Sequence, residues 1–289
     1  MSGFDAAWLT LREPFDAQAR DASLAERFTT TLSNTKRRIV DLAAGTGAAF
    51  RALAPLLRGD QDWLLVDHDP ELVAAQQDAI RHWAARNGWA CEALGDGVCI
   101  RAANATWIVR ACALDLAHDL EALDLEACDG VTASALLDLV SAGWIDRLCA
   151  VLAANRLPLL AMLSVDGRRV WNPSAPADAD IDRAFVRHQS RDKGFGPALG
   201  ARAAAVLSER LEQRGYEVTT ARSDWRIGAD HPAMLLRMAD EAAAVTAETE
   251  PGMGARFAEW QTARRRQIDA RALALEVGHL DVVGVPRSR

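Results

Sequence analysis

The sequence predicts an α/β protein with a largely parallel sheet, and three observations support this. Short apolar runs alternate with stretches of helical spacing, which is the order expected of right-handed βαβ units. The segment RRIVDLAAGTGAAF, from Arg37 to Phe50, places two glycines between an apolar strand and a helix. Half of the 289 residues are hydrophobic, which is enough for one large domain with a substantial core.

The first half of the chain predicts four core strands and the helices that connect them. Pro70 suits the first turn of a helix, and the Gly-Asp-Gly sequence at residues 95–97 predicts a hairpin before the third core strand. The expected helices are Asp16–Leu32, Ala48–Leu57, Pro70 to about Trp83 or Asn87, and a helix that ends near Ala154. The expected strands are Ile39–Leu42, Asp62–Asp67, Thr106–Ala113 and Gly130–Ser134.

The second half predicts three more strands and two segments that depart from the βαβ rhythm. Asp166–Phe195 is polar and proline-containing, which is typical of an insertion or a lid. The expected strands are Leu157–Val165, Tyr216–Trp225 and Leu275–Val285, with helices at Pro197–Arg214 and over His231–Arg271. The predicted organisation is therefore an N-terminal helical cap at 1–35 and one domain at 36–289. That domain carries the polar insertion at about 166–196 and a helical segment at about 230–271.

Composition excludes several classes of partner. The net charge is −7 and no basic block is present, so we expect no nucleic-acid partner. The five cysteines are odd in number and lack C-x-x-C spacing, which argues against a metal cluster or a disulfide framework. The N-terminus is too polar for a signal peptide, and no apolar run approaches the ~18 residues of a membrane span. We expect a cytoplasmic protein with no membrane partner; the oligomeric state is open.

The glycine turn after the first strand indicates a nucleotide-like ligand. Glycines allow close approach of the backbone, and the following helix presents unpaired N–H groups. Folds that bind NAD usually have a third glycine three places after the second, where this chain has Phe50. Asp41, just before the turn, would repel a pyrophosphate and attract an ammonium group.

Two further carboxylates distinguish between the possible ligands. Asp67 ends the second strand, where it is placed to accept hydrogen bonds from two ribose hydroxyls. Asp115 follows the third strand and is placed to accept from an adenine amino group. S-Adenosylmethionine has an ammonium group, a ribose diol and an adenine, and it has no phosphate. The residues therefore favour S-adenosylmethionine, and an NAD-linked oxidoreductase is the less favoured alternative.

The series VDLAAGTG, LLVDHDP, ALDL and DGVTASALLDLVS resembles the class I S-adenosylmethionine-dependent methyltransferases. The resemblance implies a Rossmann-like seven-stranded sheet of order 3-2-1-4-5-7-6, with the last-numbered strand antiparallel and helices on both faces. The implied cofactor-binding residues, with His68 added because it flanks the ribose position, are Asp41, Ala43, Gly45, Gly47, Asp67, His68, Asp115, Leu116 and Ser134.

The segments WLTLREPFDAQAR, RHQSRDKGFGPALG and SDWRIG also resemble a bacterial subgroup of these enzymes that has no assigned substrate. The implied activity is methyl transfer to a small-molecule acceptor of open identity. A non-catalytic subunit or sensor that binds S-adenosylmethionine is the alternative from a different class. The dense polar residues of 187–193 favour catalysis.

Those polar residues supply the candidates for the acceptor side of the site. His188 is a candidate general base, and Arg191 or Lys193 could hold a carboxylate of the acceptor. Glycines on both sides of Phe195 suit a mobile turn. The alternative is a solvated loop in which Asp192 pairs with its basic neighbours.

Two other groups of residues allow two interpretations each. Arg12, Asp16 and Arg20 are spaced by four, so they lie along one helical face. They form either an exposed ladder of ion pairs or a cover in which one arginine meets the carboxylate of the cofactor. Trp8, Trp144, Trp171 and Trp225 could form an aromatic wall around the acceptor. Core packing is the default for each of them, and Trp171 is the best candidate for an exception.

Overall fold

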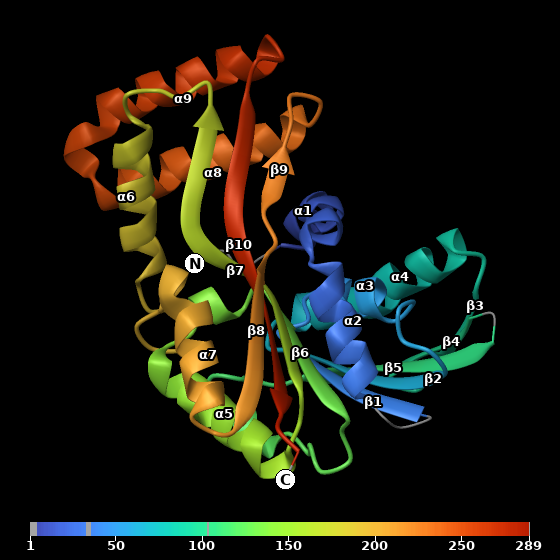
Figure 1. Cartoon of the computed structure of the whole chain (residues 1–289). Coiled ribbons are helices and arrows are strands. Elements are labelled where there is room, and N and C mark those ends of the chain that lie inside the picture. The colour runs from blue at the N-terminus through green and yellow to red at the C-terminus, as the bar shows by residue number, and fades with distance from the viewer. Residues whose placement is uncertain (1–4, 33–35, 103, 289) are drawn as a thin grey trace.

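Ten strands form one mixed sheet in the order β3-β4-β5-β2-β1-β6-β7-β10-β8, with β9 paired to β10 (Figure 1). The structure is a computed structural model and describes residues 5–32, 36–102 and 104–288. Residues 1–4 and 33–35 of the predicted N-terminal cap lie outside the described residues. The strands are β1 (Lys36–Leu42), β2 (Asp60–Asp67), β3 (Ala90–Leu94), β4 (Gly97–Ala102), β5 (Ala105–Ala113), β6 (Gly130–Ser134), β7 (Leu159–Asn172), β8 (Tyr216–Arg222), β9 (Trp225–Ile227) and β10 (Ala274–Pro286).

The predicted order of the seven core strands is confirmed. In chain order these strands are β1, β2, β5, β6, β7, β8 and β10, and across the sheet they lie as β5-β2-β1-β6-β7-β10-β8. The first five are parallel, whereas β10 is antiparallel to both neighbours. The chain order reverses between β1 and β6. In open α/β sheets, ligands bind in the crevice at such a switch point, outside the carboxyl ends of the strands.

Three strands add to the predicted seven. The expected hairpin is present as β3 and β4, and β4 pairs antiparallel with β5. The predicted single strand over Tyr216–Trp225 is interrupted. β8 ends at Arg222, and β9 pairs with an earlier part of β10 because the ladder shifts register between Val277 and His279. A register shift of this kind bends the sheet and ends one pairing before the next begins.

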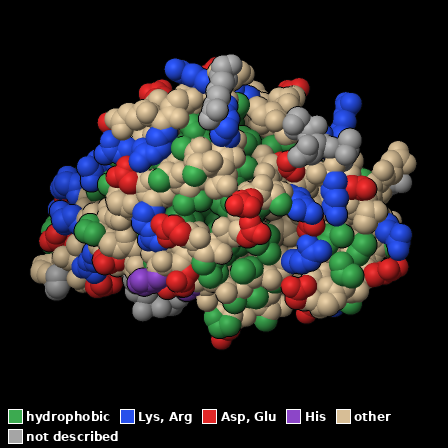
Figure 2. Space-filling model, turned by 90° about the horizontal axis from the view of Figure 1, so that it is seen from below, with side chains coloured by type: hydrophobic (Ala, Val, Ile, Leu, Met, Phe, Trp, Pro, Cys, Tyr) green, Lys and Arg blue, Asp and Glu red, His purple; other side chains and the backbone are tan. Residues whose placement is uncertain are grey.

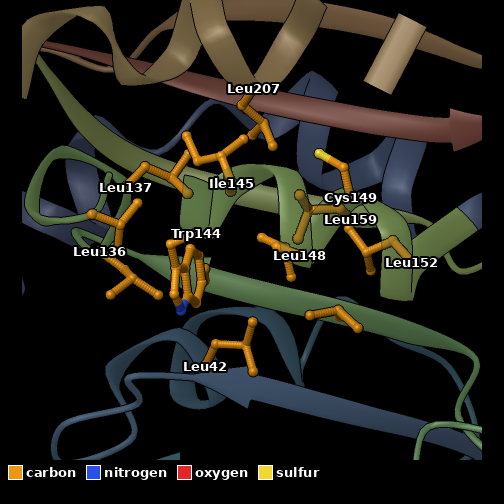
Figure 3. Close-up of a cluster of buried hydrophobic side chains, with 14 of the residues drawn as sticks. Leu42, Leu136, Leu137, Trp144, Ile145, Leu148, Cys149, Leu152, Leu159 and Leu207 are labelled. Atoms are coloured by element: carbon orange, nitrogen blue, oxygen red, sulfur yellow. The ribbon is translucent and has the colours of Figure 1, made fainter. Parts of the chain in front are cut away.

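Helices cover both faces of the sheet. α5 and α7 pack side by side on one face, and Figure 3 shows Trp144 and Leu148 of α5 toward Leu42 of β1, with Ile145 near Leu207 of α7. α2, α3 and α4 pack with β1, β2 and β5 in a second buried cluster. The helices are α1 (Ala6–Ala19), α2 (Ala22–Thr31), α3 (Ala48–Leu53), α4 (Pro70–Arg86), α5 (Ala142–Asn155), α6 (Asp178–Gln189), α7 (Ala203–Glu212), α8 (Pro232–Thr249) and α9 (Gly254–Asp269).

The single N-terminal helix predicted from Asp16 is wrong, because the chain forms two helices with a break at residues 20–21. Asp21 caps α2 by accepting a hydrogen bond from Leu24 N at 2.9 Å. Its own N–H donates to the buried carboxylate of Asp281 on β10 at 2.8 Å. The other oxygen of Asp281 accepts from Leu163 N of β7, also at 2.8 Å. One carboxylate of the sheet therefore holds the α1–α2 junction in place.

The predicted insertion after the fifth strand is largely regular structure. β7 continues to Asn172, and α6 follows it. The far ends of β7 and β10, together with β9, extend beyond the other strands, and α6, α8 and α9 pack on this extension (Figure 1). The extension and its three helices, here called the cap, bury their own core, in which Trp171, Trp225 and Trp260 take part. The predicted helical segment over 230–271 contains α8 and α9.

The face of the molecule seen from below carries both signs of charge. Figure 2 shows acidic and basic side chains interspersed on this face, with hydrophobic side chains between them. Mixed charge of this kind does not form the single-sign field that steers a polyanion.

Candidate functional site

The glycine turn follows β1 and is held by bonds from its neighbours. Ala44 N donates to Val66 O of β2 at 2.9 Å, and Gly45 N donates to Asp67 Oδ2 at 2.8 Å. Gln76 of α4 donates from Nε2 to Gly45 O at 2.9 Å. Ala43, Gly45 and Gly47 have positive φ angles of 52°, 55° and 85°. Hydrogen bonds with β2 and α4 therefore satisfy both backbone polar groups of Gly45.

Phe50 explains why a third glycine is not needed. Its ring is fully buried and makes edge contacts with Trp63 of β2 and Trp83 of α4, at centroid distances of 5.3 and 5.4 Å. Aromatic packing here separates the short helix α3 from the strands beneath it. A glycine at this position serves close packing of helix on strand in dinucleotide-binding turns. The structure therefore builds this turn in a different way.

Asp67 lies at the end of β2, as predicted, and supports the turn. Its Oδ2 accepts from Gly45 N, and its Oδ1 accepts from Asp69 N at 3.0 Å. Each carboxylate oxygen has a second lone pair, so contact with a ribose diol stays a prediction. His68 stands beside it with 74% of its side chain exposed, and its Nδ1 is 3.5 Å from Asp67 Oδ1.

Asp115 and Leu116 follow β5 at the predicted adenine position. Asp115 is exposed, accepts from Ala117 N at 2.9 Å and lies 3.0 Å from Nδ1 of His118. That contact with His118 is the main reason why the pKa of Asp115 is lowered. Leu116 is buried, and its carbonyl accepts from Trp144 Nε1 at 2.6 Å. The adenine role of this pair stays a prediction.

Asp41 is the most unusual acid at the carboxyl edge. It is 1% exposed, and its Oδ1 accepts from Thr132 Oγ1 of β6 at 2.8 Å. Its Oδ2 is buried and has no hydrogen-bond partner in the described part of the chain. Burial raises the pKa of Asp41 to about 7, although the Thr132 bond and the charge of Arg20 act in the opposite direction. A buried oxygen without a partner costs about 1–3 kcal/mol.

Arg20 lies at the α1–α2 junction and acts electrostatically on Asp41. Like Asp41, it has buried polar atoms without a hydrogen-bond partner in the described residues. Its Nη2 lies 3.4 Å from Ser134 Oγ at the end of β6. Its Nε and Nη1 are buried and lack partners among residues 5–32, 36–102 and 104–288. Burial lowers the pKa of Arg20, whereas Asp16, Asp281 and Asp41 act to raise it. The structure thus brings together Asp41, Ser134 and Arg20, one of the two arginines proposed to cover the cofactor.

Helix α1 lies directly over the glycine turn. A Cβ built on Gly45 would be 2.9 Å from Leu9 Cδ1 of α1. Glu13, one turn further along, forms a bidentate ion pair with Arg51 of α3 through contacts of 2.7 and 2.6 Å. Arg51 also donates to Thr46 O within the turn. The N-terminal helix is therefore one wall of the candidate site.

Arg12 does not take the role that Arg20 has. Its guanidinium pairs with Asp16 at 3.0 Å and lies 4.8 Å from the ring centre of Trp225. Asp16 Oδ1 also accepts from Trp225 Nε1 at 3.0 Å. Both charged residues are less than 9% exposed, so the predicted exposed ladder is wrong for this pair. The reason is the cap, which covers this face of α1 with β9.

The charged residues of 187–193 lie on the cap. His188 Nε2 is 3.5 Å from Glu248 Oε2 at the end of α8, and Arg191 pairs with the same carboxylate. Burial lowers the pKa values of both His188 and Lys193. The structure does not join His188 or Arg191 to the Asp41–Arg20 group by any contact among the described residues. Their roles as base and acceptor ligand stay predictions, and the pairing with Glu248 explains their density in the sequence.

The second half of the same segment returns to the carboxyl edge. Phe195 packs edge-on against Trp144 at 5.6 Å, next to the start of α5. Leu199 N donates to Val140 O at 2.9 Å. Trp171, the candidate for an aromatic wall, is 3% exposed and lies 5.4 Å from Trp260 in the core of the cap. Core packing, the default for such residues, accounts for Trp171.

One residue at the edge was not singled out by any sequence pattern. Asp138 lies in the loop after β6, four positions beyond Ser134, and is 8% exposed. Burial raises its pKa to about 6, and Arg12 is the charged group that counteracts this shift. Its position after a strand that ends at the switch point was the signal that could have indicated it. No spacing rule distinguished it from the other acids of the chain.

Other kinds of site find no support in the described residues. Within them, no three His, Cys, Asp or Glu side chains gather as a metal site would require. Among residues 5–32, 36–102 and 104–288, every helix is too short or too polar to cross a bilayer. The candidate site is the carboxyl edge between β1 and β6, where Asp41 and Arg20 have buried polar atoms without a partner in the described residues.

No protein-family model and no curated protein matches the chain. Among solved structures, it is similar to a candidate methyltransferase of Bacillus halodurans, with 14% identity, a TM-score of 0.49 and coverage of 92% of this chain and 100% of that one. The YcgJ protein of Bacillus subtilis is similar at 13% identity and a TM-score of 0.47, with coverage of 92% and 99%. The geranyl diphosphate C-methyltransferase of Streptomyces coelicolor, in complex with S-adenosylhomocysteine, is similar at 9% identity and a TM-score of 0.43, with coverage of 92% and 77%. Similarity at this level assigns no function, so the cofactor and reaction are inferred from the residues of the site.

Proposed function

We propose that this protein is an S-adenosylmethionine-dependent methyltransferase that acts on a small-molecule acceptor. The observation that carries the proposal is that Asp41 and Arg20 have buried polar atoms at the same edge of the sheet, where each residue acts electrostatically on the other. A buried carboxylate oxygen and two buried guanidinium nitrogens lack partners in the described residues, and the two groups act on each other electrostatically. An amino-acid zwitterion supplies an ammonium for the first and a carboxylate for the second. The methionine part of S-adenosylmethionine is such a zwitterion.

The rest of the site supports the same ligand. Asp67 and Asp115 follow β2 and β5 at the same edge of the sheet, on the side of the glycine turn away from β6. The cofactor supplies an electrophilic methyl group on a positively charged sulfur. This chain would orient the amino-acid end with Asp41, Arg20 and Ser134, and the nucleoside end with Asp67 and Asp115. A pyrophosphate would instead place negative charge beside Asp41, which disfavours NAD.

Catalysis is favoured over a purely regulatory binding role by Asp138. The polar residues 187–193 no longer distinguish the two, because His188 and Arg191 pair with Glu248 of α8. Asp138 is a buried acid with a pKa of about 6 next to the same edge, which suits proton transfer near neutral pH. Transfer of a labelled methyl group to any acceptor would separate an enzyme from a sensor.

Calorimetry with S-adenosylhomocysteine tests the proposal directly. We expect binding in the micromolar range, roughly −8 kcal/mol. Arg20→Met should weaken it about 100-fold, because removal of one partner of a buried charge pair costs about 2–5 kcal/mol. Arg27→Met is the matched control, since Arg27 lies on α2 and pairs with Glu217 at the surface. Binding of NADH in place of S-adenosylhomocysteine would contradict the assignment.

A further inference from the structure

The cap joins the main domain, which is the rest of the sheet with α2, α3, α4, α5 and α7, at interruptions of regular structure. β7 pairs with β6 as far as Met162, and the next residue, Leu163, has a φ of +57°. Beside it, the pairing of β10 with β7 shifts register between Leu280 and Val282. Interruptions of this kind allow strands to bend. Together with the breaks between β8 and β9 and between α1 and α2, they form a set here called the waist, at residues 20–21, 163–164, 223–224 and 277–282.

Side-chain carboxylates hold the waist together where β pairing is interrupted. Asp281 accepts from Asp21 N and from Leu163 N, both at 2.8 Å, and Asp224 accepts from His279 N at 3.1 Å. These bonds satisfy backbone groups that the broken ladders leave without a strand partner. Hinges of domain motion are built from a few element-terminal residues of this kind. The remaining connection, from α6 to α7, contains three glycines with positive φ, Gly194, Gly196 and Gly200.

Helix α1 packs as a part of the cap, although it begins the chain. Trp8 and Phe15 belong to the same buried cluster as Trp225 of β9. The ion pair of Arg12 with Asp16 is joined to this cluster, because Asp16 accepts from Trp225 Nε1 at 3.0 Å. A shared hydrophobic core and a buried ion pair are costly to separate. α1 and the cap are therefore expected to move as one body.

Another side of α1 meets the main domain at the glycine turn (Figure 1). A Cβ on Gly45 would lie 2.9 Å from Leu9 Cδ1, so α1 covers the face of the turn that a ligand must approach. Glu13 forms its bidentate ion pair with Arg51 of α3, and Arg51 also donates to Thr46 O in the turn. The side chain of Arg51 is 4% exposed, whereas that of Glu13 is 29% exposed. This ion pair therefore connects the body that contains α1 to the turn itself.

We propose that the cap and α1 bend as one body about the waist to admit and release the cofactor, and that Glu13 and Arg51 are positioning residues that hold the closed state. This inference rests on the proposed function. The ion pair joins the two bodies whether or not the cofactor is bound, so it stabilises the closed state of both forms. Its loss should raise the rates of cofactor entry and exit together and leave the equilibrium affinity nearly unchanged. Loss of a residue that merely supports the bound cofactor would raise the exit rate alone.

Rapid filtration of the full-length protein with tritiated S-adenosylhomocysteine measures both rate constants. Glu13→Gln should raise association and dissociation each about five- to tenfold and change Kd by less than about twofold. Leu9→Ala removes the apolar contact without a change in charge and should move both rates in the same direction. Glu26→Gln is the matched control, because Glu26 is an exposed glutamate on α2 of the main domain. Its rates should equal those of the unmodified protein.

A thiol at the turn reports opening without any ligand. Thr46 is 7% exposed beside Arg51, so a thiol introduced by Thr46→Cys should react slowly with a maleimide, and mass spectrometry of its peptide separates it from the native cysteines. Adding Glu13→Gln should accelerate this reaction about five- to tenfold, and adding Glu26→Gln should not. The inference is overturned if Glu13→Gln leaves the thiol reaction unchanged, or if it raises dissociation and Kd without raising association. If the thiol reaction accelerates but S-adenosylhomocysteine does not bind, the hinge stands and the proposed function fails.

Discussion

Replacement of Asp41 by asparagine is expected to stabilise the fold at pH 8 and to weaken cofactor binding strongly. The pKa of Asp41 is raised from 3.8 to about 7, mainly by burial. The folded state therefore holds this proton more tightly than the unfolded chain, and stability falls as the pH rises from about 4 to 7. Asparagine keeps an oxygen for Thr132 and carries no charge. We expect a gain of about 1–3 kcal/mol in the free energy of unfolding at pH 8 and little gain at pH 4.

The same charge is what the ammonium of the cofactor requires. Its removal should weaken S-adenosylhomocysteine binding by at least about 100-fold. In the unmodified protein, affinity should rise between about pH 5.5 and 7.5, because Asp41 must lose its proton to pair with the ammonium. The residual binding of Asp41→Asn should lack this rise.

Denaturant unfolding at both pH values and calorimetry across the pH range check these expectations. Asp182→Asn serves as the control, because burial also raises the pKa of Asp182, to about 6, within the cap. This control should gain stability at pH 8 and leave cofactor binding unchanged. If Asp41→Asn loses stability or binds normally, Asp41 is only a partner for Thr132.

Gly45→Val is expected to have the second large effect, on both binding and stability. Gly45 has a φ of +55°, which a β-branched residue adopts only with strain, and its Cβ would lie 2.9 Å from Leu9 Cδ1. Strain and overpacking together should cost about 2–4 kcal/mol of stability. Binding of S-adenosylhomocysteine should fall below detection, because the side chain enters the space between the turn and α1.

Gly88→Val isolates the contribution of backbone strain. Gly88 also has a positive φ, of +71°, but a Cβ at this position would have no other atom within 4 Å beyond its immediate chain neighbours. This variant should lose about 1–2 kcal/mol of stability and bind the cofactor normally. Thermal unfolding and calorimetry of the two variants give the comparison. Equal cofactor affinity in both would mean that the glycine turn is only a connection between β1 and α3.

Local patterns in the sequence were sufficient to predict the sheet and one half of the site. Apolar runs between helical stretches predict βαβ units, whose handedness and adjacency leave few possible strand orders. Asp41, Gly45 and Asp67 are each one or a few residues from a strand end, so their position at the carboxyl edge follows from the strands. The hairpin before β5 was equally local, because Gly-Asp-Gly sets its turn.

Contacts between distant segments were beyond that kind of prediction. The extension of β7 to Asn172 depends on pairing with β10, which lies about a hundred residues later in the chain. The charges of His188 and Arg191 suggest a reactive loop until α8 brings Glu248 to them. In both cases a partner remote in sequence decides the role of a segment whose own pattern is ambiguous.

By itself, the sequence determined the glycine turn and the acids at the ends of β1 and β2, because each depends on residues close together in the chain, whereas the strand order was implied by the resemblance to a known family. Only the tertiary structure decided that Arg20, and not Arg12, acts electrostatically on Asp41. Arg12 and Arg20 have the same spacing from Asp16, so the sequence cannot rank them. Asp281, 260 residues away from Asp21, accepts its N–H and sets the break between α1 and α2. Beyond α1, Arg20 lies next to Ser134, whereas Arg12 lies within α1 and pairs with Asp16. The break is kept because leaving the buried carboxylate of Asp281 without its hydrogen bond from Asp21 would cost free energy.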